Sequence, residues 1–245
     1  MIATDSPRPI ASETSDRMAS VPSGLLTCLP TRTASRTVSI RAICLCFCLS
    51  LLLGAPVARA EPPTVLVLGD SLSAAYGIRL EQGWVALLQD RLESKGYGHR
   101  VVNASSSGET TGGALARLPR ALDRHRPAVV VIELGGNDAL RGGDLAATRA
   151  NLDAMVVAAH AARARVLIVG MRVPPNYGAA YGRGFEALFA EVAKAHRTAL
   201  VPFFFEGFGD RNELFQPDRI HPSVAAQPLL LDNLWPALEP LLKPR

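Results

Sequence analysis

The stretch Val65-Leu-Val-Leu-Gly-Asp-Ser-Leu-Ser73 joins an apolar, β-type run to a short polar turn. Continuous apolar runs such as Val65–Leu68 are typical of strands in parallel sheets, which helices cover on both faces. In an open α/β sheet, ligands bind among the loops that follow the carboxyl ends of the strands. Ser71 falls in such a loop, so this stretch predicts an α/β fold and offers a candidate nucleophile. The alternative is that Ser71 only caps the next helix.

The same alternation continues along the chain. Four further strands are expected at 100–103, 128–132, 165–169 and 200–201. Apolar residues at helical spacing lie between the strands and predict helices at 82–95, 110–125, 144–162 and 181–196. A last helix is expected from Ser223 toward Leu242, interrupted by Pro228 and Pro236. Strands that alternate with helices in this way predict a βαβ sandwich with a parallel sheet.

The first 60 residues have the composition of a secretory leader. Arg36 and Arg41 precede an apolar run at 43–54, and Ala58-Arg-Ala60 has small residues at both positions that a signal peptidase inspects. The apolar run has about 12 residues, whereas a transmembrane helix needs roughly 20. We therefore expect cleavage after Ala60 and a periplasmic or secreted protein. An uncleaved membrane anchor is the alternative.

The leader also bounds the mature domain. Residues 1–37 are polar and lengthen the leader beyond an ordinary one, so we hypothesise that translation starts at Val38 and that 1–37 are not translated. Residues 61–245 then form one domain, because about 185 residues suit a single core. The chain has four cysteines, and all of them lie in the leader: Cys28, Cys44, Cys46 and Cys48. The mature part therefore has no thiol for disulfide or metal chemistry.

The charge balance argues against a nucleic-acid partner. The whole chain has 26 basic and 22 acidic residues, of which the leader holds six arginines and three acids, so the mature part is left with a net charge of +1. No basic stripe is present, and nucleic-acid binding has little support. No His-Glu-x-x-His motif, cysteine cluster or phosphate-binding glycine loop occurs, so we expect no metal and no cofactor.

A histidine near the carboxyl end completes a candidate catalytic pair with Ser71. A serine hydroxyl must lose its proton to attack a carbonyl carbon, and a neutral histidine can accept that proton near pH 7. Asp218 lies three residues before His221 in Asp218-Arg-Ile-His-Pro222. Such a turn can place a carboxylate beside Nδ1 and fix the tautomer of the ring. Alternatively, His221 caps the following helix and Asp218 is a surface charge.

Two further loops offer hydrogen-bond donors to a developing oxyanion. Asn137 ends a Gly-Gly-Asn-Asp turn after the strand at 128–132, and Gly108 follows the strand at 100–103. The Asn137 amide and the Gly108 N–H could both donate. The alternatives are an Asx turn at Asn137 and a loop glycine that merely leads into a helix. We interpret Asp138 as a structural cap.

These four segments together resemble the SGNH subgroup of the GDSL esterase/lipase family, whose four blocks are named for Ser, Gly, Asn and His. The matching residues are Ser71, Gly108, Asn137 and His221. The resemblance spans about residues 64–242 and is strongest to the bacterial thioesterase I/lysophospholipase L1 group, also called arylesterases. It implies a flavodoxin-like three-layer α/β/α sandwich with a five-stranded parallel sheet.

The resemblance also implies an acyl-ester hydrolase with an acyl-enzyme intermediate. Ser71 would be the nucleophile, His221 the base and Asp218 its orienting carboxylate. The oxyanion hole would consist of the N–H groups of Ser71 and Gly108 and the side chain of Asn137. Arg219 departs from the pattern, because a small residue is expected there.

The sequence indicates the substrate less clearly than the type of reaction. We expect a small acyl ester or a lysophospholipid, transient contact with membrane lipids, and a monomer. The aromatic residues at 203–205 and 208 either pack in the core, which we favour, or form a wall of an acyl-chain groove. Two other functions stay open: a carbohydrate O-deacetylase of the same family, and a flavodoxin-like binding module without catalysis.

Overall fold

The structure is a computed structural model that describes residues 61–243. The predicted leader, its cysteines and the cleavage site after Ala60 lie outside these residues. Between residues 61 and 243, no helix is both long enough and apolar enough to cross a membrane.

Five parallel strands form one sheet in the order β2-β1-β3-β4-β5. Their bounds are Thr64–Gly69 (β1), Arg100–Asn103 (β2), Val129–Glu133 (β3), Arg165–Val169 (β4) and Ala199–Val201 (β5). Each of the five expected strands is present. Every residue of β1 and β3 is buried, as their apolar composition predicts, while β2 lies at the edge and is partly exposed.

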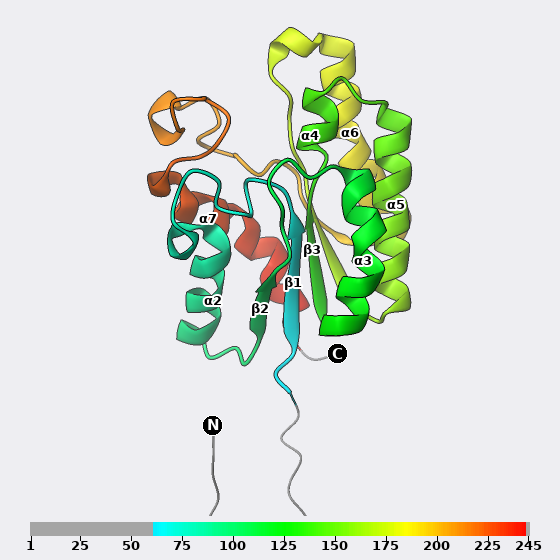
Figure 1. Ribbon diagram of the computed structural model, residues 1–245, viewed down its shortest axis with the longest axis vertical. Helices are drawn as coiled ribbons and strands as arrows, with labels where there is room; N and C mark the ends of the chain where they lie inside the picture. Colours follow the sequence, from blue (N-terminus) through cyan, green and yellow to red (C-terminus); the bar gives the residue numbers. More distant parts are fainter. Residues whose placement is uncertain (1–60, 244–245) are drawn as a thin grey trace, which may run out of the picture. The chain divides into compact units, whose positions relative to one another are not determined.

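Helices cover both faces of the sheet, so the fold has three layers (Figure 1). The α-helices are Trp84–Ser94 (α2), Thr111–His125 (α3), Gly136–Leu140 (α4), Leu145–Ala161 (α5), Ala179–His196 (α6) and Gln227–Leu238 (α7). Helices α2 and α7 pack together on one face, and α3, α5 and α6 pack side by side on the other. Short 3-10 turns lie at Leu80–Gln82, Pro175–Tyr177, Asn212–Leu214, Val224–Ala226 and Glu239–Leu241.

The core forms where apolar helix faces meet the sheet. In α2 the buried residues are Trp84, Val85, Leu88 and Leu92, which recur at helical spacing and face the strands. Trp84 meets Phe204 edge to face, with ring centroids 5.6 Å apart. Phe204 and Phe208 are buried, which confirms core packing for these two aromatic residues.

Pro228 and Pro236 were predicted to interrupt the last helix, and this prediction is wrong. Pro228 lies in the first turn of α7, where its missing N–H would have no partner within the helix in any case. Pro236 lies within the last turn, and α7 continues to Leu238. The helix begins later than expected because Val224–Ala226 forms a 3-10 turn after Ser223.

Parallel pairing brings the loops after the strands to one edge of the sheet. Gly69 at the end of β1 is in register with Glu133 at the end of β3, and Asn103 at the end of β2 lies opposite Val67, so the three strands end close together. The segments after β1, β2 and β3 carry Ser71, Gly108 and Asn137. After β3, Gly135 adopts a left-handed conformation with φ of 107° and turns the chain directly into α4.

A side chain at Gly135 should destabilise the folded protein. A Cβ at Gly135 would lie 3.3 Å from Cζ of Phe189 and 3.5 Å from Cε2 of Phe185. We expect Gly135→Ala to lower the free energy of unfolding by about 2–4 kcal/mol, from left-handed strain plus crowding. Chemical denaturation measures this loss.

Gly96 supplies the matched control, because its φ is 75° and a Cβ there would meet nothing within 4 Å. Gly96→Ala should cost only the left-handed strain, about 1–2 kcal/mol. Equal losses in the two variants would contradict the packing argument.

Candidate active site

Ser71 begins the turn that leaves the buried end of β1. Residues 71–77 form turns and no helix starts there, so the helix-cap alternative for Ser71 is wrong. The turn is closed by the Ala74 N–H, which donates to the Asp70 carbonyl at 2.9 Å, and by the Tyr76 N–H, which donates to the Ser71 carbonyl at 3.1 Å. Ser71 is therefore held at the carboxyl edge of the sheet.

His221 reaches Ser71 from a loop 150 residues further along the chain. His221 Nε2 lies 2.9 Å from Ser71 Oγ, and His221 Nδ1 lies 2.7 Å from Asp218 Oδ2. The loop is anchored by the Gln216 N–H, which donates to the His221 carbonyl at 2.7 Å, and by an isolated antiparallel bridge between Phe215 and Pro222. The three residues thus form a continuous hydrogen-bonded chain.

The Asp218 carboxylate accepts three hydrogen bonds from the turn that follows it. Its Oδ1 accepts from the N–H groups of Ile220 and His221, at 2.9 and 3.0 Å, and its Oδ2 contacts the His221 ring. Partial burial acts to raise the pKa of Asp218, but these hydrogen bonds outweigh it and lower the pKa to about 2. Asp218 is therefore ionised near neutral pH, and its carboxylate can accept a hydrogen bond from His221 Nδ1.

Arg219 occupies the middle of this turn in a left-handed conformation, with φ of 57°. This backbone conformation costs a residue with a Cβ about 1–2 kcal/mol relative to glycine. The backbone at this position thus favours glycine over any residue with a Cβ. Arg219 is exposed, and it leaves Asp218 and His221 in hydrogen-bonding register.

Asn137 lies in the first turn of α4, a short helix where the sequence predicted a Gly-Gly-Asn-Asp turn, and the alternative of an Asx turn is wrong as well. Its Nδ2 donates to Asp70 Oδ2 at 3.0 Å, which ties α4 to the loop that carries Ser71. Asp138 caps the start of α3 as expected, since it accepts from the N–H and the hydroxyl of Thr111. Gly135 and Gly136 allow α4 to begin shortly after the end of β3.

Gly108 lies in the loop after β2 with φ of 77°. Its carbonyl accepts from Arg141 Nη2 at 3.0 Å, and Arg141 directly follows α4. Among the described residues the Gly108 N–H donates to no acceptor. The structure therefore links the loop of Gly108 to the helix of Asn137 through Arg141, a contact that no sequence motif indicated.

Two buried carboxyl groups lie beneath the site. Asp70 is 3% exposed, and desolvation raises its pKa to about 6 although the Leu72 N–H and the Asn137 amide stabilise its anion. Glu133 ends β3 at 1% exposure, and its Oε2 accepts from Ser73 Oγ at 2.7 Å. Burial first, and then the charge of Asp70, raise the pKa of Glu133 well above its ordinary value. The sequence analysis did not single out Glu133. Its place as the one acidic residue at the end of an apolar strand could have indicated that it is buried.

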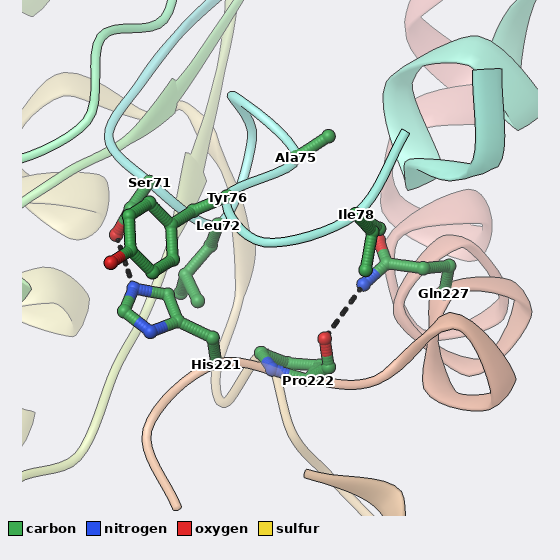
Figure 2. Close-up of a pocket in the computed structure, with 8 residues that line it drawn as sticks. All are labelled: Ser71, Leu72, Ala75, Tyr76, Ile78, His221, Pro222 and Gln227. Carbon is green, nitrogen blue, oxygen red and sulfur yellow. Dashed lines mark hydrogen bonds between the residues drawn. The ribbon is translucent and has the colours of Figure 1, made fainter. Parts of the chain in front are cut away.

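A shallow pocket with about 160 Å³ of space, part of it open to solvent, lies beside the serine and the histidine (Figure 2). Tyr76 packs against the His221 ring with centroids 4.4 Å apart and the ring planes tilted by 38°, and it is half exposed. The pocket is lined by Ser71, Leu72, Ala75, Tyr76, Ile78, His221, Pro222 and Gln227. The aromatic residues at 203–205 and 208 are absent from this lining, so they form no wall of this pocket.

The comparisons with known proteins agree with this fold. The sequence profile of the GDSL-like lipase/acylhydrolase family matches residues 67–228. The chain belongs to this family, which confirms the resemblance drawn from the four motifs. The flavodoxin-like α/β/α fold with a five-stranded parallel sheet is confirmed as well.

Within the family, several enzymes are similar to the chain. It is 53% identical over 203 residues to the esterase TesA of Pseudomonas aeruginosa, a match that covers 83% of this chain and 100% of that protein. It is 42% identical over 183 residues to the thioesterase 1/protease 1/lysophospholipase L1 of Escherichia coli K12, covering 75% and 86% of the two chains. A crystal structure of TesA superposes with a TM-score of 0.71 at 55% identity and covers 73% of this chain and 99% of that one.

The raised pKa of Glu133 has a testable consequence for stability. In the unfolded chain Glu133 has an ordinary pKa of about 4.3. The folded protein therefore keeps a proton on Glu133 at a pH where the unfolded chain has lost it. Stability should therefore fall as the pH rises above about 4.5, by up to about 1.4 kcal/mol per pH unit for one proton. Glu133→Gln cannot ionise, so its unfolding free energy should fall less between pH 5 and pH 8.

The measurement is thermal or denaturant unfolding of both proteins across this pH range. The exposed Glu206→Gln is the matched control and should follow the wild type. Parallel profiles for Glu133→Gln and the wild type would show that Glu133 does not hold its proton on folding.

Proposed function

We propose that the protein is an exported serine hydrolase of fatty acyl esters in which Ser71, His221 and Asp218 form the catalytic triad. Ester hydrolysis is the activity of the family and of the similar enzymes named above. The observation that carries the triad is the hydrogen-bonded chain from Ser71 through His221 to Asp218, at 2.9 and 2.7 Å. A binding module would have no need of this arrangement.

The first half of the reaction forms an acyl-enzyme. Ser71 Oγ attacks the acyl carbonyl carbon and passes its proton to His221 Nε2, while Asp218 stabilises the imidazolium through Nδ1. The tetrahedral intermediate collapses when its bond to the leaving oxygen or sulfur breaks. His221 gives its proton to that leaving group, and the acyl chain stays on Ser71 as an ester.

The second half releases the acid. Water attacks the acyl carbonyl carbon and gives a proton to His221, which then returns it to Ser71 Oγ as the acyl–oxygen bond breaks. In both halves the carbonyl oxygen becomes an oxyanion. We assign its donors to the N–H groups of Ser71 and Gly108 and to the Asn137 amide, each worth about 3 kcal/mol toward the barrier. The unpartnered Gly108 N–H and the position of Asn137 beside the Ser71 loop support this assignment.

The surface around the site favours a lipid-like substrate. The pocket is shallow and partly open to solvent, so a long chain must extend beyond it. Exposed apolar side chains lie within nine residues of Ser71, Asn137 or His221 along the chain: Tyr76, Leu80, Leu140, Ile220 and Val224. These side chains suit an acyl chain and transient contact with lipid surfaces better than they suit a sugar.

The proposed location narrows the substrate further. The leader pattern before Ala60 supports export, and acyl-CoA is scarce outside the cytoplasm. We therefore propose lysophospholipids and other fatty esters as substrates, with the mature chain from Glu61 acting as a monomer. Mass spectrometry of the purified exported protein tests the cleavage, since an intact leader would refute it.

Replacement of the nucleophile gives the central prediction. We expect Ser71→Ala to keep the fold and to lower kcat on p-nitrophenyl octanoate by about 10⁴-fold or more, because no acyl-enzyme can form. Wild type should react with a fluorophosphonate probe at Ser71, and the variant should not. Ser105→Ala, a serine on the neighbouring loop, is the matched control and should retain activity. Unchanged turnover by Ser71→Ala would overturn the proposed triad.

Substrate choice gives a second prediction. Because these exposed apolar side chains suit an acyl chain, kcat/KM should rise at least about tenfold from C2 to C8 p-nitrophenyl esters, as burial of each CH₂ contributes about 0.8 kcal/mol. Lysophosphatidylcholine should be hydrolysed and acetylated xylan should not. A preference for acetylated xylan over the C8 ester would favour the carbohydrate deacetylase instead.

A further inference from the structure

The Asn137 amide forms one hydrogen bond among the described residues and leaves its other polar positions free. Nδ2 donates to Asp70 Oδ2 at 3.0 Å, while the second N–H and Oδ1 have no partner there. The side chain is half-buried at the carboxyl edge of the sheet, within the first turn of α4. One N–H is thus fixed by Asp70, and the other is available to a ligand.

The chemistry of the partner determines which way this amide faces. An amide has a donor side and an acceptor side that differ little in shape, so packing alone does not distinguish its two orientations. An ionised carboxylate accepts hydrogen bonds and donates none. Asp70 can therefore pair only with Nδ2 of Asn137, never with Oδ1.

We infer that Asp70 is a positioning residue for the oxyanion hole, whose carboxylate holds the Asn137 amide with its second N–H toward the substrate. The inference rests on the proposed function, in which Asn137 donates to the oxyanion. It assigns to Asp70 a role through Asn137 and no contact with the substrate.

The carboxylate is itself held rigidly. Asp70 Oδ1 accepts from the Leu72 N–H at 3.0 Å, which leaves Oδ2 for Asn137, and the side chain is buried. Glu133 lies beneath the same loop and binds Ser73. The pKa of Asp70 is raised only to about 6, so the group is ionised and acceptor-only in an assay at pH 8.

The near-isosteric variant Asp70→Asn should reverse the orientation of the Asn137 amide. Its Oδ1 can still accept from Leu72, which turns its own NH₂ toward Asn137. Two NH₂ groups cannot pair, so Asn137 must flip and accept through Oδ1. A carbonyl lone pair then points where the second N–H had pointed, and it repels the oxyanion. Asp70→Ala imposes no orientation, so the amide can still donate part of the time.

The expected order of activity is therefore the opposite of the order of chemical similarity. At pH 8, on p-nitrophenyl octanoate, Asn137→Ala should lower kcat about 10²–10³-fold, and Asp70→Asn should lower it at least as far. Asp70→Ala should lower kcat less, by about tenfold, through looser positioning. KM should change little in all three variants, since the contact is made mainly in the transition state.

A double-mutant cycle separates positioning from structure. In the Asn137→Ala background, Asp70→Asn should cause no further loss of kcat, because the residue through which it acts is gone. Unfolding free energies of all variants are measured beside the rates. Asp144→Asn makes the same chemical change at the N-cap of α5, where Asn caps as well as Asp, and should leave both quantities unchanged.

The outcomes are distinct. Losses that add in the double variant, or an Asp70→Asn enzyme more active than Asp70→Ala, would overturn the positioning role while Ser71→Ala still reports on the triad. Full kcat in Asn137→Ala would overturn the oxyanion role of Asn137 and the inference with it. Loss of activity in Ser71→Ala together with non-additivity of Asp70 and Asn137 supports both.

Discussion

The position of β1 between two other parallel strands is the constraint on which the site depends. Its residues pair with β2 on one side and β3 on the other, and all six are buried. Because β1 and β3 end in register and β2 ends nearby, opposite Val67, the segments that follow these strands share one edge of the sheet, and Ser71 starts the central loop. His221 then has to come from only one further loop to complete the hydrogen-bonded chain. The sheet thus assembles residues separated by 150 positions.

Two aspartates at this edge show how the environment sets the chemistry of one side-chain type. Asp218 is partly exposed and receives backbone N–H groups from its own turn, so its pKa falls to about 2. Asp70 is buried, and its pKa rises to about 6 even though it accepts hydrogen bonds. In the proposed mechanism, the first carboxylate faces a histidine that becomes positive, and the second faces a neutral amide whose orientation it fixes.

The candidate site combines an exposed aromatic side chain with a tightly packed turn. Tyr76 lies against the His221 ring and is half exposed. After β3, by contrast, Gly135 packs so closely against Phe185 and Phe189 that a Cβ would lie 3.3 Å from the nearer ring. In the proposed mechanism, packed support for the oxyanion donors and a shallow pocket suit an enzyme that accepts acyl groups of different lengths. The family to which the chain belongs includes enzymes named as esterase, thioesterase and lysophospholipase.

The sequence by itself determined the five strands, the family and the residues of the candidate site. Strand periodicity is local, and the four motifs depend on residue type at short spacing, so both can be read from the chain. The sequence did not determine that Asn137 would lie in a helix, that Pro228 would begin α7 instead of interrupting it, or that Tyr76 would pack against His221. Nor could it reveal the hydrogen bonds from Asn137 to Asp70 and from Arg141 to Gly108. The last three contacts join residues from different segments of the chain, and only the packing of the strands and helices brings those segments together.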